Sequence, residues 1–267
     1  MRVSFERTIT TVVAVVSVVA IVFSANAADK AGPAAKRVEL FEAIKAGDIA
    51  VKLIPKDAKE ANVLIENKAK QPLEIKLPEA FAGVPVLAQI GGLGGGGFGG
   101  GGLGGGGVGG GGGGQNQAMG GGMMGGMGGM GGMGGMFNVA PGKVGKIQVA
   151  TVCLEHGKTD PNPRVPYEIR PIESFTQDQR VAEVCKMLGR GEVTQNAAQA
   201  AAWHFTDGLS WEQLAAKDRV KLSNGYTEKY FSPQELAVAM RVTLEAVRRA
   251  EGKKSDTSDP YPSLSRN

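Results

Sequence analysis

The sequence predicts an α+β protein: an antiparallel β-sandwich (Ig-like) interrupted by a disordered Gly/Met-rich loop and followed by a helical C-terminal part. Three observations support this fold class. Short segments with alternating apolar residues stand on both sides of a glycine-rich tract. That tract, residues 91–136, holds 31 of the 42 glycines of the 267-residue chain. Beyond residue 173, apolar residues recur at helical spacing instead.

Residues 1–27 have the pattern of a cleavable signal peptide. Two arginines precede an apolar run over residues 12–23, and Ala25 and Ala27 occupy the small-residue positions of a signal-peptidase site. The run is shorter than the roughly 20 residues that a membrane-spanning helix needs. We therefore expect export to the periplasm, the cell surface or the medium, with no transmembrane span after cleavage. An uncleaved membrane anchor is the alternative.

The mature chain is predicted to start with a flexible arm, residues 28–37, and then to form the sandwich over residues 38–172. Apolar residues at helical spacing from Val38 predict a short helix that stops at Gly47. Five alternating segments then predict antiparallel strands with one buried face. They cover residues 49–55, 61–67, 73–78, 143–155 and 165–172.

The Gly/Met-rich tract is predicted to be a disordered loop within the sandwich. Closing a flexible loop of 46 residues costs only about 2 kcal/mol more than closing one of six, because the penalty grows with the logarithm of length. Met127, Met130, Met133 and Met136 repeat every third residue, and thioether sulfur is a ligand that suits Cu(I). Weak Cu(I) binding is therefore an alternative role. We expect no cofactor, because glycine pre-organises no site and the tract holds no histidine or cysteine.

Residues 173–251 are predicted to be helical and to pack on the sandwich. Apolar spacing predicts one helix that ends at Gly189 and a second through the Ala-rich stretch that follows. Ser210 and Ser232 each precede a Gln or Glu by three positions, which is the capping-box spacing that begins two further helices. The polar residues 252–267 are predicted to be a disordered tail.

Composition excludes several function classes. The net charge of +4 is small, and no basic run is interleaved with aromatic residues, so nucleic acid is not an expected partner. No nucleophile elbow is present, and we predict no enzyme. Cys153 and His156 stand at Cys-x-x-His spacing, but only Cys185 and His204 could complete a zinc set, so we expect no metal. The prediction is a non-catalytic exported binding or structural protein, whose partner would be another protein of the cell envelope or surface.

The cysteine pair has two interpretations at this level. In an oxidising compartment an even number of cysteines favours a disulfide. A bridge between Cys153 and Cys185 would join a predicted strand to the helix after it and contribute about 3 kcal/mol. Cys185 also lies on the apolar face of its predicted helix, where a free thiol packs well. Free thiols therefore remain open as the alternative.

A third interpretation of Cys153 comes from a resemblance. The segments CLEHGKTDPNPRVPYEI (153–169) and AQAAAWHFTDG (198–208) resemble the two motifs of thioester domains in bacterial surface adhesins. In that family the Gln of a T-Q-x-A-I-W-x-F-T-D-G motif is joined to an upstream Cys, and the thioester acylates amines on a partner. The resemblance implies Cys153 as the thioester cysteine and Gln199 as the acyl donor. The whole chain also resembles exported bacterial proteins with CLEHGK and AAWH segments, which assigns no activity.

Overall fold

The computed structural model of the chain describes residues 34–86, 116–123 and 135–257. The helices and strands below belong to one compact unit, Ala35–Asn267. The predicted signal peptide, residues 1–27, lies outside the described residues. Within the described ranges no helix is both long and apolar enough to cross a bilayer.

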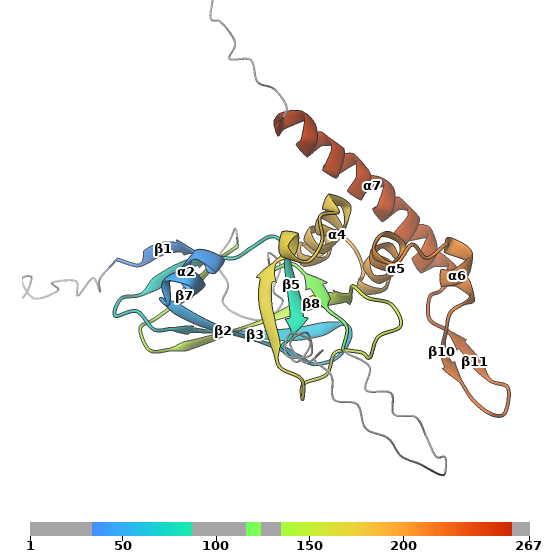
Figure 1. The fold of residues 1–267 in the computed structure, drawn as a ribbon, viewed down its shortest axis with the longest axis horizontal. Coiled ribbons are helices and arrows are strands. Elements are labelled where there is room, and N and C mark those ends of the chain that lie inside the picture. Colours follow the sequence, from blue (N-terminus) through green and yellow to red (C-terminus); the bar gives the residue numbers. More distant parts are fainter. Residues whose placement is uncertain (1–33, 87–115, 124–134, 258–267) are drawn as a thin grey trace, which may run out of the picture. The chain divides into compact units, whose positions relative to one another are not determined.

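Six antiparallel strands close a barrel in the spatial order β2-β3-β8-β6-β5-β9 (Figure 1). They are β2 (Ile49–Pro55), β3 (Glu60–Asn67), β5 (Phe81–Pro85), β6 (Met119–Gly121), β8 (Val144–Cys153) and β9 (Tyr167–Pro171). The predicted Ig-like β-sandwich is therefore wrong, because one sheet closes on itself where two facing sheets were expected. Alternating apolar residues identify the buried face of each strand. The same alternation is expected in a sandwich and in a barrel, so it does not distinguish the two folds.

The strand that completes the barrel, β6, comes from the glycine-rich tract. It pairs with β5 on one side and with β8 on the other. A Cβ at Gly121 would lie 2.7 Å from the carbonyl oxygen of Ala150, so a larger residue would push β6 away from β8. The sequence predicted one disordered loop over residues 91–136, and the structure corrects this for residues 116–123. Most of the remaining tract lies outside the described residues.

A second sheet has the order β1-β4-β7, with β1 parallel to β4. Its strands are β1 (Lys36–Glu39), β4 (Leu73–Lys76) and β7 (Met136–Val139), and α2 (Leu40–Ala46) follows β1. α2 ends at Gly47, whose φ of 74° lies in the left-handed region that favours glycine. The predicted helix is confirmed from Leu40 onwards, whereas Val38 and the end of the predicted arm 28–37 belong to β1.

The C-terminal part is helical, and it also contains a hairpin that the sequence did not predict. Its helices are η2 (Ile172–Ser174), α4 (Gln179–Gly189), α5 (Gln195–Thr206), α6 (Trp211–Ala216) and α7 (Pro233–Thr257). The hairpin pairs β10 (Asp218–Lys221) with β11 (Thr227–Lys229). α4 and α5 pack against β8, where Val152 and Val184 share one apolar cluster. α7 continues into the predicted disordered tail, of which residues 252–257 are helical.

A capping box begins α7 at Ser232. The Ser232 Oγ accepts a hydrogen bond from the Glu235 N–H at 3.2 Å, and the Glu235 carboxylate accepts one from the Ser232 N–H at 2.8 Å. Ser232→Ala should lower the free energy of unfolding by about 1 kcal/mol in urea denaturation, because an N–H at the helix start loses its partner. Ser232→Asp keeps an acceptor at the cap and should retain wild-type stability. Equal losses in the two variants would contradict this role.

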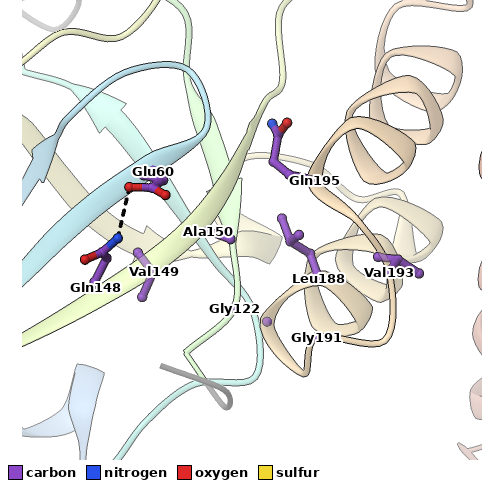
Figure 2. Close-up of a pocket in the computed structure, with 10 residues that line it drawn as sticks. Glu60, Gly122, Gln148, Val149, Ala150, Leu188, Gly191, Val193 and Gln195 are labelled. Atoms are coloured by element: carbon purple, nitrogen blue, oxygen red, sulfur yellow. Dashed lines mark hydrogen bonds between the residues drawn. The ribbon is translucent and has the colours of Figure 1, made fainter. Parts of the chain in front are cut away.

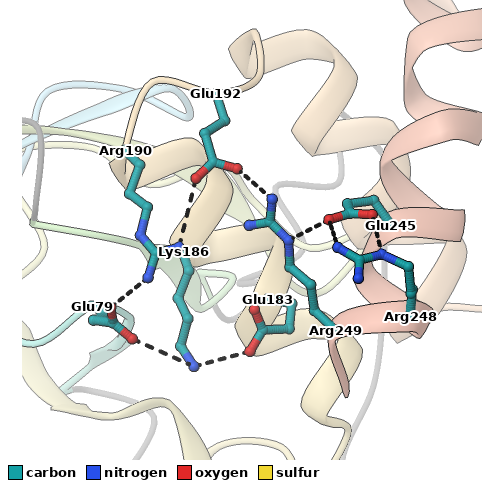
Figure 3. A network of polar contacts seen from close by, with 8 residues as sticks. All are labelled: Glu79, Glu183, Lys186, Arg190, Glu192, Glu245, Arg248 and Arg249. Carbon is teal, nitrogen blue, oxygen red and sulfur yellow. Dashed lines mark hydrogen bonds and ion pairs between the residues drawn. The ribbon is translucent and has the colours of Figure 1, made fainter. Parts of the chain in front are cut away.

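Ion pairs join α7 to the segment after α4, and that segment to the residues before β5 (Figure 3). Arg249 of α7 binds Glu192 at 2.8 Å and Glu245 at 2.6 Å. Arg190, just after α4, contacts Glu79 and lies 3.6 Å from Glu192. Each partly exposed pair contributes little stability by itself. Because the pairs are connected, they hold α7 in one orientation on α4.

Candidate functional site

The structure brings Cys153 and Gln199 into direct contact. Cys153 is the last residue of β8, and Gln199 lies in the middle of α5. The Cys153 N–H donates a hydrogen bond to Gln199 Oε1 at 2.8 Å, and Gln199 Nε2 donates one to the Cys153 carbonyl oxygen at 2.9 Å. Both residues are buried, with 1% and 0% of their surface exposed. Two residues 46 positions apart are therefore joined through both ends of one carboxamide.

The path of β8 explains why this carboxamide is needed. The last bond of β8 toward the β3 side runs from the Thr151 N–H to the Lys59 carbonyl oxygen at 2.7 Å. Cys153 lies beyond this point, and its N–H and C=O are buried on the same side of β8. Without Gln199 these two groups would have no hydrogen-bond partner there. Gln199 supplies both a donor and an acceptor, as the next residue of a neighbouring strand would. The pair therefore also anchors α5 to the end of the barrel strand.

Small side chains allow α5 to approach β8 this closely. Five alanines of the helix are fully buried beside Gln199. They are Ala197, Ala198, Ala200, Ala201 and Ala202. Alanine keeps the helix intact and adds no bulk between the helix backbone and the strand. The Ala-rich stretch is thus the local sequence feature that brings the Gln199 side chain within reach of β8.

The Cys153 thiol is neutral at pH 7. Its Sγ lies 3.7 Å from the Ala58 carbonyl oxygen. Burial raises the pKa of Cys153 far above its ordinary value, and the negative charges of Asp160 and Asp57 raise it further. A buried, protonated thiol is inert toward solvent oxidants.

An aromatic cluster lies beside the pair. Trp203 follows Gln199 by one helical turn, and its indole N–H is buried with no hydrogen-bond partner among the described residues. The Trp203 ring meets the ring of His156 edge-on at 4.9 Å, that of Tyr230 at 5.3 Å and that of Phe231 at 6.0 Å. These rings come from the segment after β8, from α5 and from the end of the hairpin. They limit the access of water to this end of α5.

His156 and Lys217 meet at the edge of the aromatic cluster. Lys217 Nζ lies 2.9 Å from His156 Nε2, and it also lies over the rings of Trp203 and Tyr230 at 5.2 and 5.6 Å. Burial lowers the pKa of His156, the positive charge of Lys217 lowers it further, and Asp207 partly opposes this. His156 is therefore a neutral imidazole at pH 7, with Nε2 facing an amine.

The structure does not form the predicted disulfide. Both thiols are free, and Cys153 and Cys185 belong to different apolar clusters. Cys185 faces β6, where a Cβ at Gly120 would lie 2.7 Å from its Sγ. Burial raises the pKa of Cys185 to about 12. Cys185 therefore packs as a small apolar residue between α4 and the barrel.

The predicted copper ligands and the zinc set are not assembled within the described residues. Met127, Met130 and Met133 lie outside those residues, and Met136 starts β7. His204 Nδ1 lies 2.8 Å from the Leu209 carbonyl oxygen, and the His204 ring stacks on the Trp211 ring with 4.5 Å between the centroids. In the described part of the chain no three His, Cys, Asp or Glu side chains are grouped to hold a metal ion.

Two pockets lie near the contact between barrel and helices. One, of about 280 Å³, is lined by β8, α4 and the start of α5, and its polar groups include a Gln148–Glu60 hydrogen bond of 2.9 Å (Figure 2). No predicted site residue lines it. The other, an open pocket of about 440 Å³, is lined by His156, Glu155 and Asp207 among others. This second pocket gives a route from solvent to His156.

Sequence reasoning missed most of the groups around the pair. His156 was considered only as a metal ligand, although its place three residues after Cys153 put it near the site. Lys217 and Tyr230 carried no signal, because they flank a hairpin that the sequence did not predict.

The chain has no match among protein-family models, curated proteins or solved structures. The interpretation of the site therefore depends on the two motifs and on the contacts of Cys153 and Gln199 described above.

Proposed function

We propose that this protein is an exported module of the cell envelope that forms an internal thioester between Cys153 and Gln199 and thereby attaches covalently to an amine of a partner. The observation that carries the proposal is the double hydrogen bond between the Gln199 carboxamide and the backbone of Cys153. It unites the two residues that the motif resemblance singled out.

The hydrogen bonds hold the Gln199 carboxamide at the backbone of Cys153, and ring closure requires the Cys153 sulfur to turn from the Ala58 carbonyl oxygen toward that carboxamide. The Cys153 sulfur attacks Cδ of Gln199, the Sγ–Cδ bond forms, the Cδ–Nε2 bond breaks, and ammonia leaves with the thiol proton. During the attack, negative charge develops on Oε1, which already accepts the Cys153 N–H at 2.8 Å. A donor held in place at a developing oxyanion lowers the barrier without reorganisation. The Cys153 carbonyl oxygen holds Nε2, the atom that departs.

The second step transfers the acyl group to the partner. An amine nitrogen attacks Cδ, an amide bond forms, the Cδ–Sγ bond breaks, and the Cys153 thiol is restored. Because Cys153 and Gln199 are almost fully buried, water is excluded from the thioester until a partner arrives. Each molecule reacts once, so the protein is not an enzyme. With the leader 1–27 directing export, the partner would be another protein of the envelope or surface.

The intact mass of the mature protein tests the proposal. A thioester lowers the mass by one ammonia, a disulfide lowers it by two hydrogens, and free thiols lower it by neither. We expect the loss of ammonia in the wild type and no loss in Cys153→Ser. Cys185→Ser is the matched control and should still lose ammonia. A full wild-type mass under native purification would contradict the thioester and leave a non-covalent binding or structural role.

A further inference from the structure

We propose that His156, Trp203 and Tyr230 form a binding site for a primary ammonium group, which Lys217 occupies in this structure and which the acceptor amine enters when it reacts. The role in acyl transfer rests on the thioester proposed above. The ammonium site itself rests on the contacts of Lys217 alone, and it can be tested separately.

Lys217 is held by an imidazole and two aromatic rings. Its Nζ lies 2.9 Å from His156 Nε2, 5.2 Å from the centroid of Trp203 and 5.6 Å from that of Tyr230. None of the ion pairs in the described part of the chain includes Lys217. A cation within about 6 Å of aromatic ring centroids is attracted by their electron-rich faces, and such cages recognise ammonium ligands. The geometry is therefore that of an ammonium site filled by the chain's own lysine.

The site lies beside the acyl group that an amine would attack. Trp203 follows Gln199 by four residues on α5, so both side chains lie on the same side of the helix. Trp203 and Cys153 also belong to one apolar cluster. The ring cluster thus connects the Lys217 ammonium to the Cys153–Gln199 pair.

His156 supplies the proton acceptor that an amine needs. An ammonium ion has no lone pair, so it must lose a proton before it can attack a thioester. One proton passes from the ammonium to His156 Nε2, and the free amine nitrogen bonds to Cδ of Gln199. The Cδ–Sγ bond then breaks, a second proton passes from the same nitrogen to the Cys153 sulfur, and His156 releases the first proton to water. The charged groups that act on His156 are Lys217 and Asp207, and burial together with Lys217 keeps it neutral at pH 7.

An external amine can approach His156, one member of the site, from the open pocket of about 440 Å³. His156 lines this pocket together with Glu155, Lys158 and Asp207. Because Lys158 pairs with Glu155, Asp207 supplies the negative charge that favours an approaching cation. Lys217 lies in the short segment between α6 and β10 and is half-exposed, so its side chain can leave without unfolding a helix. We therefore expect Lys217 to compete with the amine of the partner.

Occupancy of the site can be measured without a thioester. In the Cys153→Ser protein, NMR titration of the His156 ring should show a raised pKa when Lys217→Met removes the neighbouring ammonium. Added methylammonium should lower it again by entering the vacated site. Lys221→Met, at an exposed lysine of β10, is the control and should leave the His156 pKa unchanged. A Lys217→Met protein whose His156 does not respond to methylammonium would overturn the site.

The reaction itself gives the second test. In protein with an intact Cys153–Gln199 thioester, Lys217→Met should speed cleavage by methylamine about tenfold, the factor expected if Lys217 fills the site nine-tenths of the time. Cleavage by hydroxylamine, which is uncharged at neutral pH, should not change. His156→Gln should slow methylamine cleavage about 100-fold and flatten its pH profile. Methylamine cleavage rates that are unchanged in both Lys217→Met and His156→Gln would overturn the proposal. If the wild type shows no loss of ammonia, the thioester is contradicted, and the NMR titration alone decides whether the ammonium site exists.

Discussion

Gln199→Leu in a Cys153→Ala background should lower the free energy of unfolding by about 2–6 kcal/mol, because it leaves two buried backbone groups without partners. These groups are the N–H and C=O of residue 153, which Gln199 binds at 2.8 and 2.9 Å. Leucine has nearly the same volume as glutamine, so the variant removes the polar contacts and opens little space. The alanine background removes any contribution of a thioester cross-link. Urea denaturation followed by far-ultraviolet circular dichroism measures the difference.

The control for this prediction is the Cys153→Ala single variant. It keeps both backbone hydrogen bonds with Gln199 and loses only the sulfur, so we expect a cost near 1 kcal/mol. If the double variant is no less stable than this single variant, Gln199 does not anchor α5 to β8. In that case the contact would have to be explained by acyl chemistry alone.

Gly122→Ala should lower the free energy of unfolding by about 3 kcal/mol, through overpacking between β6 and α4. A Cβ at Gly122 would lie 2.5 Å from the Glu79 carbonyl oxygen, 2.8 Å from the Cys185 carbonyl oxygen and 2.9 Å from Gly189 Cα. All three neighbours are backbone atoms, which cannot rotate away as a side chain can. The added methyl group must therefore separate α4 from the barrel. Urea denaturation measures the loss.

Gly252→Ala is the matched control, because a Cβ there meets nothing within 4 Å. Gly252 lies within α7, where alanine is favoured over glycine by about 1 kcal/mol, so this variant should be as stable as the wild type or more stable. We therefore expect Gly122→Ala to lower the free energy of unfolding and Gly252→Ala to leave it unchanged or raise it. A Gly122→Ala protein with wild-type stability would show that the backbone just after β6 does not contact α4.

The local elements were largely predictable. Alternation located β2 and β3 because each of these strands buries one face, and capping chemistry located Ser210 and Ser232 at helix starts. β6 was not predictable from local pattern. Its three residues, Met119–Gly121, carry no alternation, and glycine has low intrinsic strand preference. They form a strand because only glycine allows Ala150 and the other neighbours to approach so closely.

The candidate site divides in the same way. The motif resemblance named Cys153 and Gln199, whereas no pattern in the sequence related His156 to Lys217. Those two residues are 61 positions apart, and they meet because the hairpin between α6 and α7 returns the chain to the end of β8. A contact of this kind depends on the path of the whole chain, which local spacing does not encode.

By itself, the sequence located the secondary structure of many segments, and it predicted a leader and the two residues on which a thioester would depend. The tertiary structure alone decided that the strands close into a barrel, that part of the glycine-rich tract becomes β6, and that an imidazole, an amine and three aromatic rings gather beside α5. The physical reason is the distance along the chain between the residues that interact. Periodicity and caps arise from neighbours within one or two turns, but strand closure and side-chain clusters arise from packing between segments distant along the chain.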